Sequence, residues 1–241
     1  MSSPDNIEAV RRDCLEDAQA LCLLLTNAGE AFERRFARIR SILSTELTGQ
    51  SCVRLGCQIH ALRHSLIGIQ DQLLESTIGD IRAFIDTASR LTAQHSEWHK
   101  FLHEAEAAKA DAKIGDAAKE ALKRLADNQG SVSQPLLDDM NVLVEDNGDE
   151  DPISSFFLVR AAQSLYSAIA RAIIARFDGI MQQVKQGVDK GAALALLGGG
   201  LILASAAAAG PLNELAIRYP EDFSWVQNFL EAVKAIKDFI S

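Results

Sequence analysis

The amino-acid sequence predicts an all-α protein, in which a long antiparallel helical hairpin or bundle is followed by a hydrophobic C-terminal helical subdomain. Helix-forming residues dominate the 241-residue chain, which holds only five prolines. Clusters of the β-branched and aromatic residues that strands require are missing, and aromatic residues make up 6% of the chain. Apolar residues recur at spacings of three and four over long stretches, which is typical of helices that bury one face.

The first expected helix runs for about 44 residues, from the N-terminus to Thr48-Gly49. Ser3-Pro4-Asp5 has the composition of a helix start, with a capping hydroxyl, a proline in the first turn and an acid. The apolar positions beyond it follow a nearly heptad pattern, and Gly49 is a suitable stop. These positions are Ile7, Val10, Cys14, Leu21, Leu25, Ala28, Phe32, Ile39 and Leu43.

A second long helix is expected from about Ser51, with a slip of its apolar stripe near Ser76–Gly79. Because the connection is short, the two long helices should pack antiparallel like a coiled coil. Residues 104–127 are rich in Ala, Lys and Glu and are expected to form an exposed segment or a short third helix. Residues 1–127 therefore form the first predicted domain.

An acidic linker is expected at residues 128–152. Residues 138–151 carry seven of the acids and no base, in a chain whose net charge is −9. The acids around Gly148 lack the spacing and the terminal Glu of a calcium loop, so no metal site is predicted there. The chain also lacks a dense run of Lys and Arg, which disfavours nucleic acid as a partner.

The predicted C-terminal subdomain, residues 153–241, is a hydrophobic helical bundle or hairpin. Pro152 opens a strongly apolar helix that is expected to reach about Gln186. Tyr219-Pro220-Glu221-Asp222 is expected to start the last helix, because it places a proline and acids in the first turn.

The residues from Gly191 to Leu212 run for 22 positions without a charge. As a helix they would be ~33 Å long, the thickness of a bilayer core. Their high Ala and Gly content weakens membrane insertion and favours a helix that is buried at rest. Small residues at Gly187, Gly191, Ala195 and Gly199 form a ladder that permits close helix packing. The candidate membrane-inserting side chains are Leu194, Leu196, Leu197, Leu201, Ile202 and Leu203.

All five histidines lie in two helical clusters, His60 with His64, and His95 with His99 and His103. Imidazoles four positions apart share a helix face and can hold zinc. If the second helix is one rod, the two clusters lie ~46 Å apart, whereas a break near Gly79 would let them approach. These histidines can equally be surface or partly buried side chains that bind no metal. We therefore expect no cofactor and keep zinc as the alternative.

Arg90 and His95 match the R-x4-H spacing that the HEPN ribonuclease families use. The resemblance covers six residues, and it implies an Arg and a His from two protomers converging on an RNA phosphate. Leu91 stands where that family usually has a polar residue. A helical metal- or RNA-dependent enzyme is therefore retained as a remote alternative.

The sequence predicts a conditional membrane-interacting helical protein without catalytic activity. Its architecture is similar to that of helical pore-forming and cell-death or toxin-like effectors, whose apolar helix is buried at rest. The main alternative is a soluble adaptor or scaffold that binds a partner through its long amphipathic helices. The expected partners are membrane lipid or partner protein helices, together with self-association. No signal-peptide core and no CxxC pair are visible, so a cytoplasmic, membrane-associating location is expected.

Overall fold

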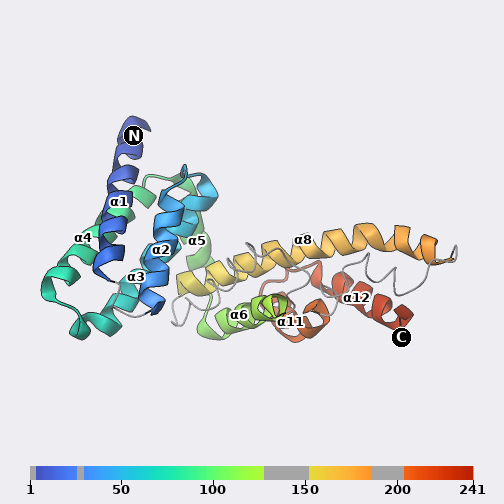
Figure 1. Ribbon diagram of the computed structural model, residues 1–241. Coiled ribbons are helices and arrows are strands. Elements are labelled where there is room, and N and C mark those ends of the chain that lie inside the picture. The colour runs from blue at the N-terminus through green and yellow to red at the C-terminus, as the bar shows by residue number, and fades with distance from the viewer. Residues whose placement is uncertain (1–3, 26–29, 128–151, 186–203, 241) are drawn as a thin grey trace. The chain divides into compact units, whose positions relative to one another are not determined.

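A computed structural model describes residues 4–25, 30–127, 152–185 and 204–240. In these ranges the chain is helical and contains no strand, so the predicted all-α class is confirmed (Figure 1). The chain divides into two compact units. Unit 1 comprises Met1–Ala110 and Asp146–Ser154, and unit 2 comprises Asp111–Glu145 and Ser155–Ser241.

Unit 1 is built from five α-helices and one short 3₁₀ helix among its described residues. Its core collects apolar side chains from the first four α-helices and contains Phe36, Leu62 and Phe84. The predicted apolar stripe of the N-terminal segment lies largely in this core. The elements are α1 (Pro4–Leu24), α2 (Glu30–Leu43), α3 (Gly49–Ile69), η1 (Gln70–Gln72), α4 (Glu75–Thr92) and α5 (Ser96–Ala108).

The prediction of a single 44-residue N-terminal helix is wrong. Helix α1 ends at Leu24, α2 begins at Glu30, and the two helices pack against each other. Their orientation is antiparallel, because Arg11 near the start of α1 donates hydrogen bonds to the carbonyl oxygens of Leu43 and Thr45 at the end of α2. The heptad pattern continues across the break because both helices bury their apolar stripes in the same core.

The second predicted long helix is divided into α3, α4 and α5. Helix α3 passes into η1, and Leu73 and Leu74 are extended before α4 begins. A second break follows at His95, the N-cap residue of α5. Helix α3 packs against both α4 and α5, so the elongated hairpin is replaced by a compact bundle of shorter helices.

Helix α3 begins earlier than predicted because Thr48 and Ser51 form a capping box. The Thr48 amide donates to Ser51 Oγ at 2.8 Å, and the Ser51 amide donates to Thr48 Oγ1 at 3.4 Å. These bonds satisfy amide groups that the first turn of a helix leaves without intrahelical partners. Gly49 is therefore the first residue of α3 and not the stop of a preceding helix.

Unit 2 surrounds a second core, which contains Leu122, Tyr166, Leu212 and Phe229. Apolar residues on the last helix are buried as the sequence pattern predicts, but the helix starts at Val226 because residues 220–225 form turns. Figure 1 shows α8 with the other helices of the unit along it. They are α6 (Ala112–Ala126), α8 (Pro152–Lys185), α11 (Ala209–Arg218) and α12 (Val226–Ile240).

Residues 104–127 contain the end of α5 and all of α6, which confirms the expected short helix and rules out a wholly exposed segment. Helix α6 starts at an N-cap, where Asp111 accepts a hydrogen bond of 3.0 Å from the Ile114 amide. Its side chains at Ala118, Ala121 and Leu122 are buried in unit 2. Of the predicted acidic linker at residues 128–152, residues 128–151 lie outside the described residues, and Pro152 is the first residue of α8.

Candidate functional site

Helix α8 is the one helix in the described part of the chain that is long and apolar enough to cross a membrane. By length and composition, the stretch Pro152–Ala175 meets that criterion over 24 residues. The core helix of a soluble protein can meet it as well, but such a helix is mostly buried. Only 33% of the most apolar window of α8 is buried.

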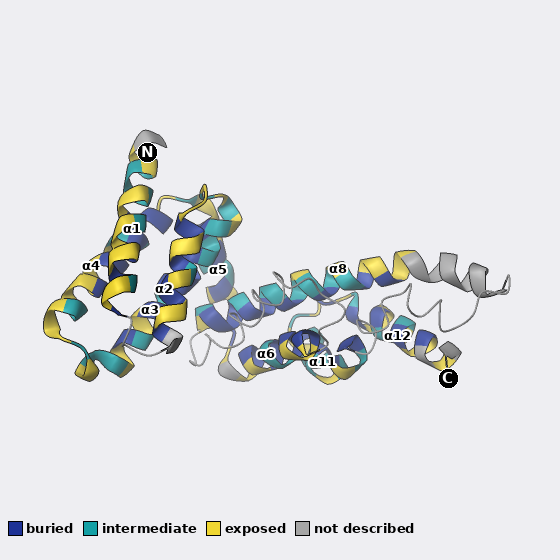
Figure 2. Cartoon of the chain, in the orientation of Figure 1, coloured by how far each residue is buried: buried dark blue, intermediate teal, exposed yellow. Residues whose placement is uncertain are grey.

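Buried positions become less frequent along α8 toward Ala175, although Ala170 and Ile173 are still at most 3% exposed. Phe156, Leu158 and Val159 are at most 2% exposed, whereas Ile174 is 47% exposed and Ala175 is exposed (Figure 2). Leu158 and Val159 anchor this part of α8 in the core of unit 2. The later turns keep apolar surface that the described residues do not cover.

Between residues 156 and 175, the charged and hydrophilic residues of α8 lie on one stripe of the helix. Arg160, Gln163, Ser164, Ser167 and Arg171 follow one another at spacings of one, three and four positions. A helix with a narrow basic and polar stripe and an otherwise apolar surface suits the interface of a lipid bilayer.

The uncharged run from Gly191 to Leu212 is described only from Ala204 onward. Ala204, Ala208 and Leu212 have no exposed surface and lie in the core of unit 2. The prediction of one uninterrupted helix through residue 212 is wrong, because α11 begins at Ala209 after an N-cap at Ala208. Pro211 explains the break, since proline lacks the amide hydrogen and clashes with the preceding helical turn.

The predicted membrane-inserting side chains and the ladder of small residues lie outside the described residues. Their roles stay predictions. In the described end of the run, Ala204, Ser205, Ala208 and Leu212 are buried, whereas Ala207 and Gly210 are exposed.

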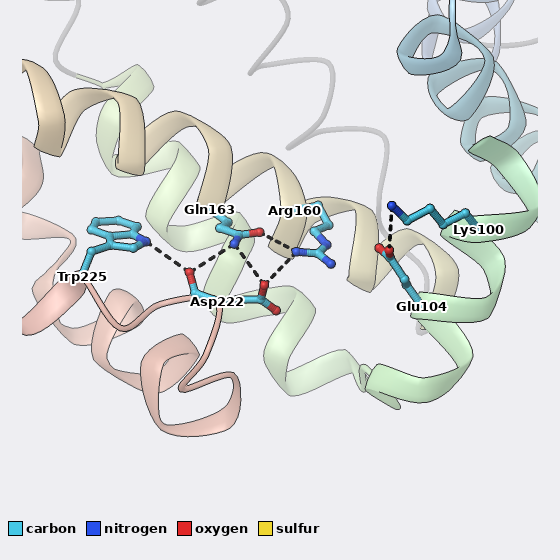
Figure 3. A network of polar contacts seen from close by, with 6 residues as sticks. All are labelled: Lys100, Glu104, Arg160, Gln163, Asp222 and Trp225. Carbon is cyan, nitrogen blue, oxygen red and sulfur yellow. Dashed lines mark hydrogen bonds and ion pairs between the residues drawn. The ribbon is translucent and has the colours of Figure 1, made fainter. Parts of the chain in front are cut away.

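A network of polar contacts joins α8 to the turn that precedes α12 (Figure 3). Arg160 Nη1 lies 2.9 Å from Asp222 Oδ1, and Gln163 Nε2 donates to Asp222 Oδ1 and to the Asp222 carbonyl oxygen, both at 3.1 Å. Arg160 Nη1 also donates to Gln163 Oε1 at 2.8 Å. The indole Nε1 of Trp225 donates to the Asp222 carbonyl oxygen at 3.2 Å. Asp222 thus receives hydrogen bonds from both sides of the interface.

Aromatic rings surround this network. The Arg160 guanidinium lies over the Phe156 ring, with 5.1 Å between Cζ and the ring centroid, a cation–π geometry. The Trp225 ring contacts Phe223 and Phe229, with centroid distances of 6.1 and 5.8 Å. We refer to Arg160, Gln163, Asp222 and Trp225 as the clasp.

Helix α8 is held to α6 by a different contact. The hydroxyl of Tyr166, which has no exposed surface, donates a hydrogen bond of 2.7 Å to the carbonyl oxygen of Ala121. Burial raises the pKa of this phenol above its usual range. Helices α6 and α11 are joined separately, by an ion pair of 2.8 Å between Lys113 and Glu214.

The five histidines lie on α3 and α5 or at the start of α5. The rings of His60 and His64 are 4.9 Å apart, and His99 Nε2 is 2.8 Å from the carbonyl oxygen of Ala93. Within the described ranges, no three His, Cys, Asp or Glu side chains come together as a group that could hold a metal ion. The breaks in the second predicted helix exclude the rod-like separation of the clusters, and zinc binding by His60, His64, His95, His99 and His103 stays a prediction.

The R-x4-H pair lies on separate helices. Arg90 is exposed in the last turn of α4, and its Nε donates to the Asp86 carbonyl oxygen at 3.3 Å. His95 is the N-cap residue of α5. The Arg90 guanidinium is thus engaged by its own helix, which gives the HEPN resemblance no further support.

A small cavity of about 280 Å³ lies between α3 and α4. This volume is below the range of about 300–1,000 Å³ that is usual for ligand pockets. Its polar side chains include Arg63 and Asp86, whose nearest charged atoms are 3.7 Å apart. It is lined by Arg63, Leu66, Ile67, Gln70, Arg82, Ile85 and Asp86.

Sequence reasoning placed Arg160 and Asp222 on two different apolar helices but did not predict their contact. They are 62 positions apart, and neither belongs to a local motif. The available signal was Asp222 itself, an acid beside the bulky apolar residues Phe223 and Trp225, in a subdomain whose preceding helix carries arginines.

The comparisons with known proteins find no matching family model, and no curated protein or solved structure that is significantly similar to this chain.

Proposed function

We propose that this chain is a conditional membrane-binding helical protein whose apolar C-terminal segments are packed within unit 2 at rest. The observation that carries the proposal is the incomplete burial of α8, the described helix with the length and composition of a membrane span. The exposed apolar surface of α8 favours transfer of this helix to lipid, because each Å² of apolar surface removed from water contributes about 25 cal/mol.

The uncharged run that follows α8 supports the proposal. Its six large side chains contribute roughly −2 to −3.5 kcal/mol on a membrane-insertion scale, which the glycines offset in part. Insertion is therefore marginal, and packing of the end of the run in the core competes with it. This balance is the physical basis for binding that depends on a trigger.

The arginines of α8 decide the expected geometry at a membrane. A charged residue at the centre of a bilayer costs roughly 2.5–3.5 kcal/mol, so Arg160 and Arg171 oppose a transmembrane position of this helix. Both arginines belong to its polar stripe. We infer that α8 lies along the bilayer interface, with the apolar run of residues 191–212 entering more deeply.

An adaptor that binds a partner through its long amphipathic helices has less support. It requires the amphipathic helices of the N-terminal segment to present a free apolar stripe to a partner. In unit 1 most of that stripe is buried in the unit's own core, including Cys14, Leu21 and Ile39. An adaptor would have to use other surfaces.

Vesicle flotation with matched aspartate variants tests the proposal. The full chain is mixed with phosphatidylcholine vesicles over a range of temperatures below its unfolding transition. Leu197→Asp places a charge in the uncharged run, and Ile217→Asp places the same charge at a side chain of α11 that is 84% exposed. Neutral lipid removes the contribution of protein net charge, and circular dichroism confirms that each variant is helical.

We expect the lipid-bound fraction of the native chain and of Ile217→Asp to rise together with temperature. Leu197→Asp should bind about 100-fold more weakly, because an acid within the bilayer costs roughly 2.5–3.5 kcal/mol. The proposal fails if the native chain never floats with the vesicles. It also fails if Leu197→Asp floats as well as Ile217→Asp.

A further inference from the structure

We propose that the clasp is an autoinhibitory contact, in which Asp222 holds α8 in the packed state and so sets how readily the chain binds membrane. The inference rests on the proposed function for its membrane readout. The contact itself is a property of unit 2 and can be measured without lipid.

The clasp connects α8 to a different part of unit 2. Its contacts on α8, Arg160 and Gln163, lie next to the turns that begin at Phe156, where buried positions are more frequent than in the turns near Ala175. Asp222 lies outside α8, in the turn between α11 and α12. Release of α8 therefore requires the separation of Arg160 and Gln163 from Asp222.

The charges of Arg160 and Asp222 strengthen this contact in the packed state of α8. The Asp222 carboxylate accepts hydrogen bonds from a guanidinium and from an amide, and bonds with an ionised partner are stronger than neutral ones. The side chains of Arg160 and Asp222 are 34% and 35% exposed, so water screens the pair in part. A contact of moderate strength can hold α8 in the packed state and still permit its release.

The clasp also orders the turn that carries Asp222. Its carbonyl oxygen accepts from Gln163 of α8 and from the Trp225 indole. Trp225 in turn packs beside Phe223 and Phe229, which have at most 1% of their surface exposed. Movement of α8 away from Asp222 is thereby coupled to the packing of the last helix.

Asp222→Asn is the informative substitution because it removes the charge without altering α8. Replacing Arg160 would change both the clasp and the intrinsic lipid affinity of the helix. Asp238→Asn is the matched control, since Asp238 is exposed on α12 and the substitution changes the net charge equally. Hydrogen exchange of α8 peptides reports on its release without lipid, and flotation with phosphatidylcholine vesicles reports on binding.

In Asp222→Asn we expect exchange in residues 156–175 to be about tenfold faster than in Asp238→Asn, and vesicle binding to be stronger by a similar factor. Exchange in α6 should change less, because α6 stays packed on α11. Equal exchange of α8 in the two variants overturns the clasp, as does a uniform acceleration throughout unit 2. Faster exchange of α8 with no vesicle binding keeps the contact but overturns both its inhibitory role and the proposed membrane function. If both variants bind vesicles equally and exchange of α8 is the same in both, the clasp is overturned but the proposed membrane function is not.

Discussion

Trp98 of α5 lies against the backbone of Gly56 in α3. A Cβ atom placed on Gly56 would come within 2.5 Å of the Trp98 ring, closer than real contacts allow. The glycine is inside a helix, where alanine is ordinarily preferred by about 0.8–1.0 kcal/mol. The close approach of the indole to α3 therefore explains why this helix interior carries a residue of low helix propensity.

The first prediction follows from this packing. Gly56→Ala should lower the free energy of unfolding of unit 1 by about 1–3 kcal/mol, because the added methyl group displaces the Trp98 ring. Gly68→Ala is the control in the same helix, since nothing lies within 4 Å of its added Cβ. This control should be neutral or stabilising, as measured by urea denaturation. Equal effects of the two substitutions would contradict the packing of Trp98 on α3.

A second prediction concerns the end of α2. Arg11→Met should destabilise the protein by about 1–2 kcal/mol, because it leaves the carbonyl oxygens of Leu43 and Thr45 without their charged donor. Arg12→Met is the control, since Arg12 is exposed on the same helix and surface substitutions usually change stability by less than about 0.5 kcal/mol. Thermal unfolding of both variants provides the comparison. A loss as large in Arg12→Met would show that the contribution of Arg11 is not a specific cap.

A third prediction concerns the anchor between α8 and α6. Tyr166→Phe keeps the buried ring but removes the hydrogen bond to the Ala121 carbonyl oxygen. We expect unit 2 to lose about 1–2 kcal/mol of unfolding free energy, since one buried bond is removed without creating a cavity. Tyr219→Phe, at a half-buried tyrosine of the same unit, should change stability less. Chemical denaturation gives the comparison. If Tyr166→Phe has the same midpoint as the native chain, the hydrogen bond to Ala121 does not contribute to stability.

The fourth prediction is a loss of stability at alkaline pH. Burial raises the pKa of the Cys14 thiol to about 11 and that of Cys52 to about 12, above the value of 9.0 for an unperturbed thiol. From about pH 9 upward the unfolded chain releases these protons while the folded chain retains them, so the unfolding free energy falls as pH rises toward 11–12. Replacing both residues with alanine should make this decline shallower in denaturation curves at pH 8 to 11. An unchanged slope would show that the two thiols do not contribute.

The sequence was sufficient for the helical class and for the faces that the helices bury. Periodic apolar positions identify a buried stripe even where the helix bounds are wrong, because Cys14, Phe32 and Ile39 occupy core positions in either arrangement. The bounds were wrong because a heptad pattern has the same appearance in one long helix and in two helices packed on one core. The sequence signals the end of α1 at Leu24 only weakly, through the poor helix formers Asn27 and Gly29.

The candidate site was predicted only in part. Composition alone identified the apolar helix that begins at Pro152, and α8 has nearly the predicted bounds. The clasp could not be predicted, because the contact between Arg160 and Asp222 depends on how α8 and the turn before α12 are brought together. Long-range polar contacts of this kind leave no periodic signal in a single sequence.

The most direct test of the account is the depth that the apolar run reaches in a bilayer. A fluorophore is attached at Leu201→Cys or, as the control, at Ile217→Cys, with Cys22 replaced by serine because it is the least buried native cysteine. Phosphatidylcholine vesicles carry a quencher on the acyl chains. We predict strong quenching at position 201 in the lipid-bound chain and weak quenching at position 217. Weak quenching at both positions in a chain that floats with vesicles would contradict entry of the apolar run into the membrane.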